Sequence, residues 1–327
     1  MKNKLKIVAL AGGVGGAKLA HGLAQVLPPE DLTIIVNTGD DFEHYGLYIC
    51  PDLDTVCYTL AGIANPETGW GRSGETWNMM ENLSKLGGAD WFRLGDKDLG
   101  THLERTQRLK EGYSLSQITK DFCNAWGIGH TVLPMSDKPV RTFVETDEGE
   151  LEFQEYFVHR RCEPRVRGFW FDGIDQAEPV RGAREALQSA DAVIICPSNP
   201  WVSIDPILAT FTPPPLSSRS IPEGERERGW GDGKKVVAIS PIIGGEAIKG
   251  PAAKMYRELG IEPSALAVAN HYRGLVTDFV LDKIDEQLNE TVKGLSMRAY
   301  VTNTLMRSHE DRKQLAIDLL TYIGSDL

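Results

Sequence analysis

The sequence lacks the features that mark several large classes of protein. Its five cysteines are odd in number and scattered, without Cys-x-x-Cys spacing, so neither a disulfide framework nor a zinc site is predicted. No stretch approaches the roughly 18 apolar residues that a membrane helix needs. The N-terminus becomes glycine-rich too early for a signal peptide. These absences predict an unprocessed cytoplasmic protein with no membrane partner.

Positive charge is also scarce. Lys and Arg number 35 against 46 Asp and Glu, a formal net charge of −11, whereas nucleic-acid-binding proteins normally present a basic face. A nucleic-acid partner is therefore not expected, and any anionic ligand must be bound by local amides, cationic side chains or a metal. The 327 residues, 41% of them hydrophobic, suffice for a substantial core in one large or two unequal domains.

The N-terminal region predicts the opening of a nucleotide-binding α/β fold. An apolar run over residues 5–11 leads into GGVGGAK and then into an amphipathic pattern, which is the order strand, loop, helix. Amides in such a loop bind anions, assisted by the helix dipole. The candidate nucleotide-binding residues here are Gly12, Gly13, Gly15, Gly16 and Lys18. A tight turn without a ligand is the alternative, because the spacing fits neither GxGxxG nor the P-loop, which disfavours NAD binding and P-loop hydrolysis.

Two later strand-to-turn segments extend this pattern. ADAVIIC leads to a polar turn that contains Ser198 and Asn199, and KKVVAIS leads to Gly244 and Gly245. All four residues are candidates for nucleotide binding, because ligands of open α/β sheets bind at the carboxyl ends of strands. Lys249 and Lys254 follow and suit a phosphate, or equally a solvated surface.

The overall prediction is an α/β fold: a Rossmann-like parallel sheet with a smaller antiparallel insertion. Residues 1–129 and 176–327 form the nucleotide-binding core. Residues 130–175 form the insertion. Within them VRTFVETDEGELEFQEYFV alternates apolar and polar side chains around Asp147-Glu148-Gly149, which predicts a hairpin that serves as a lid or an oligomerisation element. The segment 212–233, rich in Pro, Gly, Ser and charge, is predicted to be a mobile loop or linker.

The most informative stretch is residues 36–55, VNTGDDFEHYGLYICPDLDT, which follows an apolar run. It gathers four acids near the end of a buried strand, namely Asp40, Asp41, Asp52 and Asp54. Crowded carboxylates are costly unless a cation shares the site, and this density of oxygen ligands suits magnesium bound to a phosphate. Each acid alone is equally typical of a turn or helix cap, but the cluster favours a functional site.

A second acidic turn lies in WFRLGDKDLGTH, where Asp96 and Asp98 precede His102. Arg93 in this segment is either a solvated or ion-paired surface group or, beside the acidic turns, a group that orients a polar substrate. Trp70 and Trp77 upstream suit either the core or a platform for a flat aromatic ligand.

Together, these motifs resemble the 2-phospho-L-lactate transferase family of coenzyme F-420 biosynthesis. The segments that carry the resemblance are GGVGGAKL, VNTGDDFEHYGLYICPDLDT, WFRLGDKDLGTH, PSNPWVSIDPIL and SPIIGGEAIKGPAAKM. The related gluconeogenesis-factor-like proteins, which bind nucleotide sugars and regulate metabolism, share the glycine loop but carry a different acidic segment. A regulator of that kind is the alternative function.

The resemblance implies transfer of a phosphate-linked three-carbon acid from a guanosine diphosphate conjugate to the deazaflavin Fo, with release of GMP and use of Mg²⁺. The acid is 2-phospholactate or its enolpyruvyl counterpart. It also implies a homodimer and substrate contacts from Asp54 and Arg93, with His44 as a further candidate. As a hypothesis, Asp40 and Asp54 hold the metal, while Asp54 or Asp41 accepts the proton of the attacking hydroxyl.

Overall fold

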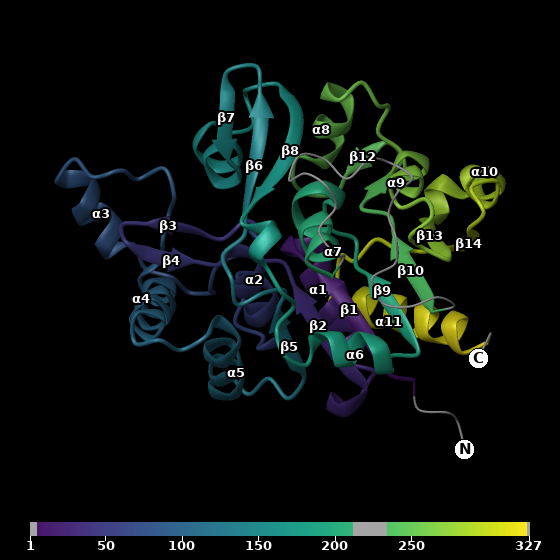
Figure 1. Cartoon of the computed structure of the whole chain (residues 1–327), viewed down its shortest axis with the longest axis horizontal. Coiled ribbons are helices and arrows are strands. Elements are labelled where there is room, and N and C mark those ends of the chain that lie inside the picture. Colours follow the sequence, from purple (N-terminus) through teal and green to yellow (C-terminus); the bar gives the residue numbers. More distant parts are fainter. Residues whose placement is uncertain (1–4, 212–233, 326–327) are drawn as a thin grey trace.

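A seven-stranded parallel sheet forms the centre of the computed structural model, which describes residues 5–211 and 234–325 (Figure 1). Every adjacent pair of its strands is parallel. Across the sheet the strands are β14 (Arg298–Thr302), β13 (Asp278–Asp282), β10 (Lys235–Ile239), β9 (Ala192–Ile195), β1 (Ile7–Ala11), β2 (Leu32–Val36) and β5 (Thr131–Pro134). The predicted Rossmann-like core is confirmed. The loop predicted at 212–233 lies outside the described residues.

Helices cover both faces of this sheet, because its strands are apolar on both sides. In β1, Val8 and Leu10 face one core cluster, while Ile7, Ala9 and Ala11 face the other. The first cluster packs on α6 (Ala183–Ser189), α7 (Asp205–Phe211), α9 (Ala265–His271) and α10 (Asn289–Lys293). The second packs on α1 (Gly13–Ala24), α2 (Pro51–Leu60), α5 (Leu115–Ala125) and α11 (His309–Gly324).

Two appendages extend from the core (Figure 1). One is an antiparallel sheet made of β6 (Arg141–Thr146), β7 (Gly149–Glu152) and β8 (Val166–Asp172). The segment that connects β7 to β8 contains the π-helix η2 (Glu155–His159). The other contains the hairpin β3 (Phe42–His44) and β4 (Leu47–Ile49) with α3 (Asn78–Lys85) and α4 (Asp96–Lys110). The predicted hairpin around residue 148 is confirmed. The insertion begins later than residue 130, because β5 pairs with β2 in the core sheet.

The remaining elements are short. They are β11 (Ile242–Ile243), β12 (Glu246–Ala247), α8 (Ala252–Glu258), the π-helix η4 (Pro200–Ile204) and the 3₁₀ turns η1 (Pro29–Asp31), η3 (Ile174–Gln176) and η5 (Lys283–Leu288). Within residues 5–211 and 234–325, no helix has the length and apolar character that a membrane crossing requires.

The strand order creates a crevice between β1 and β9. From β1 the chain continues through β2 to β5 on one side, then returns to β9 on the other side. The loops that leave β1 and β9 therefore diverge, and ligands of open α/β sheets bind at such a switch point. The glycine loop, residues 12–16, follows β1. From Gly13 onwards it forms the first turn of α1, where an open loop was predicted. The Ser198–Asn199 turn follows β9, so both predicted anion-binding segments border this crevice.

Close packing of the first turn of α1 on the turn after β9 depends on Gly15, and this generates a stability prediction. A Cβ at Gly15 would lie 2.1 Å from the carbonyl oxygen of Pro197, so Gly15→Ala should lower the free energy of unfolding by about 1–3 kcal/mol, as other overpacking changes do. Urea unfolding measures this. Gly100→Ala is the control, because nothing lies within 4 Å of that Cβ position in α4; an equal loss in both variants would contradict the prediction.

Candidate active site

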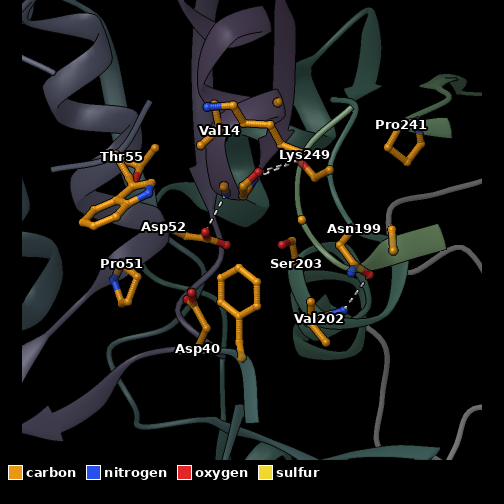
Figure 2. A pocket seen from close by; sticks show the side chains of 18 of the residues that line it. Val14, Asp40, Pro51, Asp52, Thr55, Asn199, Val202, Ser203, Pro241 and Lys249 are labelled. Carbon is orange, nitrogen blue, oxygen red and sulfur yellow. Dashed lines mark hydrogen bonds between the residues drawn. The ribbon is translucent and has the colours of Figure 1, made fainter. Parts of the chain in front are cut away.

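A cavity of about 600 Å³ occupies the crevice at the carboxyl ends of the parallel strands (Figure 2). Its walls come from the glycine loop, the start of α2, the turn after β9, the segment after β10, and the antiparallel insertion. Nine predicted site residues line it: Gly12, Gly13, Gly15, Lys18, Asp40, Asp54, Arg93, Ser198 and Asn199. Segments far apart in sequence thus meet where the fold predicts a ligand.

The glycine loop is closed by Asp52, which stands in the first turn of α2. The amide of Gly13 donates to Asp52 Oδ1 at 2.6 Å, so this carboxylate caps the positive end of α1. The approach is close, since a Cβ on Gly12 would lie 2.5 Å from Asp52 Oδ2. Sequence reasoning placed Asp52 in the acidic cluster without a role; the structure makes it the link between that cluster and the glycine loop.

Asn37, directly after β2, joins two of the buried acids. Its Nδ2 donates to Asp52 Oδ2 at 3.0 Å and approaches Asp40 Oδ1 at 3.4 Å. Burial first, and then the charges of Asp52 and Asp41, raise the pKa of Asp40 well above its usual range. Burial likewise raises the pKa of Asp52 to about 6, against the hydrogen bonds from Asn37 and Gly13. Asp40 and Asp52 point into the same space, opposite Ser203 (Figure 2).

Asp54 belongs to a different buried group. Arg105 of α4 grips it with both terminal nitrogens, Nη1 lying 3.0 Å from Asp54 Oδ2. His102 Nδ1 lies 3.7 Å from the same oxygen, and its Nε2 lies 3.5 Å from Asp98 Oδ1. Burial raises the pKa of Asp54, and Arg105 and His102 only partly oppose this. Asp54, Asp98 and His102 have ligand atoms close enough to share a cation, but Arg105 already neutralises Asp54.

The turn after β9 is organised by its own side chains. Ser198 donates its hydroxyl to Gly12 O at 2.8 Å and accepts from Gly12 N at 3.2 Å, which ties the turn to the glycine loop. Asn199 accepts from the amides of Trp201 and Val202 and so caps η4. Both residues therefore shape the cavity wall as well as facing it.

Cationic side chains border the cavity on two sides. Lys18 donates to Met306 O at 2.9 Å, and Lys249 donates to Thr68 O at 2.6 Å. Burial, Arg312 and Lys249 lower the pKa of Lys18. Lys254, the other lysine considered from the sequence, does not line the cavity and pairs with Glu258.

The two tryptophans considered from the sequence have different surroundings: Trp77 packs in an apolar cluster, and Trp70 lines the cavity. The Arg93 guanidinium lies 4.3 Å from the ring centre of Trp77, which packs in the small apolar cluster around Phe42. Trp70 lines the cavity and is half exposed. Of the two tryptophans, Trp70 is thus the one placed to contact a ligand.

Five predicted site residues do not line the cavity: Gly16, Asp41, His44, Gly244 and Gly245. Gly16 allows close packing on the Ser198 hydroxyl. Asp41 is buried, beside the Cys50 thiol and near Arg141. His44 is enclosed by the rings of Tyr45, Trp91 and Phe92. Gly244 and Gly245 form the β11–β12 turn, where both have the positive φ that favours glycine. These five residues have structural surroundings, and the sequence pattern alone did not distinguish them from residues that line the cavity.

Known proteins resemble this chain over nearly its whole length. The family model described as 2-phospho-L-lactate transferase CofD matches residues 7–323. A phosphoenolpyruvate transferase of Streptomyces griseus subsp. griseus is 44% identical over 309 residues, covering 92% of this chain and 93% of the relative. A 2-phospho-L-lactate transferase of Methanosarcina mazei is 38% identical over 310 residues, covering 95% and 98%.

A UPF0052 family protein from Bacillus halodurans has a similar structure, with a TM-score of 0.58 over 97% of this chain and 99% of that one. At 14% identity this likeness concerns the fold alone. The family model and the two enzymes, by contrast, cover nearly the whole sequence. The chain therefore belongs to the 2-phospho-L-lactate transferase CofD family and is a transferase.

Proposed function

We propose that this transferase moves a phosphate-linked three-carbon acid from a guanosine diphosphate conjugate to a hydroxyl of the deazaflavin Fo, giving a coenzyme F-420 precursor and GMP. The observation that carries this proposal is the meeting of the glycine loop, Arg93 and three acids, Asp40, Asp52 and Asp54, in one cavity. Both 2-phospholactate and its enolpyruvyl counterpart remain candidates, because relatives named for each match most of the chain. A cytoplasmic homodimer is part of the proposal.

In this reaction the acceptor hydroxyl oxygen bonds to the phosphorus that bears the three-carbon acid. The bridging bond to the guanylyl phosphate breaks, GMP leaves with the bridging oxygen, and the hydroxyl proton passes to a base. Such transfers need positioning and charge neutralisation more than a covalent nucleophile. Cationic Lys18 and Lys249, with the polar turn at Ser198, supply positioning groups around the cavity.

The chemistry of the acids fits a magnesium ion. Asp40 and Asp52 are both buried and both lie against the amide of Asn37, with no cationic side chain hydrogen-bonded to either carboxylate in the described residues. Two carboxylates so placed repel each other unless a cation is shared, and hard cations prefer oxygen ligands. Mg²⁺ bound there would neutralise charge on the diphosphate. Asp52 replaces Asp54 in our proposed metal pair, because Arg105 already pairs with Asp54.

Asp54 is then the proposed proton acceptor. It lines the cavity, Arg105 fixes its orientation, and burial raises its pKa, which favours acceptance of a proton. Asp41, the other candidate base, does not line the cavity. We propose that Asp41 acts only through its charge on this buried network.

The primary test supplies purified protein with Mg²⁺, Fo and each guanylyl conjugate, then detects GMP and the charged fluorescent product by chromatography. Wild-type protein should form both.

Asp54→Asn should lower kcat by about 100-fold or more through loss of the base. It should also lower stability by about 3 kcal/mol or more, because Arg105 becomes a buried unpaired charge. Asp90→Asn, at an exposed position, is the control. An inactive wild type that binds a nucleotide sugar would instead favour the regulator.

Removal of the metal gives a second prediction. Excess EDTA should stop GMP release, and added Mg²⁺ should restore it, because the diphosphate charge is otherwise unbalanced. Asp40→Asn should raise the Mg²⁺ concentration needed for half-maximal activity and weaken Mg²⁺ binding measured by calorimetry. Full activity in EDTA would remove Mg²⁺ from the proposal.

The buried acids also predict a pH-dependent stability. Burial raises the pKa of Asp41 to about 7, so between about pH 4 and pH 7 the native state keeps a proton that the unfolded chain releases. Stability should therefore fall as pH rises through this window and level off above it. Asp41→Asn should remove up to about 4 kcal/mol of that fall. Urea unfolding in EDTA measures it; parallel pH curves for both proteins would contradict the assignment.

A further inference from the structure

Gln154 brings the antiparallel insertion into contact with the acidic centre. It lies between β7 and η2, 114 positions from Asp40 in sequence, and its Nε2 donates to Asp40 Oδ2 at 3.2 Å. Gln154 is buried and lines the cavity. No motif in the sequence singles out this residue.

The position of Gln154 is set by its apolar neighbours. Phe153 and Tyr156, on either side of it, are buried in the core of the insertion with Val144 and Val166. The same cluster includes Val202 of η4 and Met255 of α8, which belong to the central domain. The backbone that carries Gln154 is therefore fixed by packing, independently of its hydrogen bond to Asp40.

A second contact ties the insertion to the same loop. The amide of Thr142, on β6, donates to the carbonyl of Gly39 at 2.6 Å. On the other side of Asp40, the amide of Asn37 approaches Oδ1. The Asp40 carboxylate is thus held between one side-chain amide from the end of the central sheet and one from the insertion.

We propose that Gln154 is a positioning residue of the transferase, which holds Asp40 in the orientation that the reaction uses. One side-chain amide on each oxygen fixes the orientation of this carboxyl group. The insertion then contributes a positioning residue to the active site, in addition to the predicted role as a lid or an oligomerisation element. The expected change in reaction rate rests on the proposed function. The hydrogen bond from Gln154 to the Asp40 carboxylate does not depend on that function.

The test compares wild type with Gln154→Met and Gln154→Glu. Methionine keeps the length and flexibility of the side chain and suits the apolar surroundings, but donates no hydrogen bond. Gln154→Met should lower kcat about tenfold or more, as loss of a hydrogen bond to a charged group does, while KM for Fo changes less than about twofold. Gln154→Glu places a like charge against Asp40 and should be more impaired. Glu152→Ala, exposed at the end of β7, should match wild type.

Binding and stability measurements separate positioning from a purely structural role. Calorimetric titration with GDP in Mg²⁺ should show several-fold weaker affinity for Gln154→Met, and thermal unfolding should show a folded protein at the assay temperature. Wild-type kcat and GDP affinity in this variant would overturn the inference. If wild type itself makes no product, the proposed function fails; GDP affinity then decides alone, and an unchanged value for Gln154→Met refutes the role of Gln154.

Discussion

The burial of several carboxylates at the end of a parallel sheet is the constraint on which this site depends. Asp40, Asp41, Asp52 and Asp54 are each less than a tenth exposed, where an unpaired charge is costly. The structure offsets that cost by different means. Asp52 accepts from the glycine loop, Asp54 pairs with Arg105, and Asp40 lies between two amides. Burial nonetheless raises the pKa of all four carboxyl groups.

The strand order explains why these groups meet. Strands are added on one side of β1 as far as β5 and then on its other side from β9, and this switch in strand order opens a crevice. Helix α2 begins beside the glycine loop, so Asp52 reaches Gly13 across 39 positions. The insertion then closes one side through Gln154 and Thr142. Core sheet, acidic segment and insertion therefore line one cavity.

Family and fold were predictable because their signals are local. Apolar runs followed by glycine or polar turns predicted the parallel core, and alternation around residue 148 predicted the hairpin. Residue choice within the site was less predictable. Gly244 and Gly245 look like a phosphate-binding turn in sequence but form a hairpin turn with positive φ. The pairing of Asp54 with Arg105 was not predictable, because nothing near position 54 indicates a partner 51 residues away.

The sequence by itself determined the elements, the order of the motifs and the clustering of acids, because hydrophobic periodicity and turn chemistry act over a few residues. Only the tertiary structure decided which partner each buried carboxylate has. It paired Asp52 with Gly13, Asp54 with Arg105 and Asp40 with Gln154. Such pairings depend on distances across the fold and on burial, because electrostatic interactions strengthen as water is excluded. The local pattern of residues determines neither the distances nor the burial.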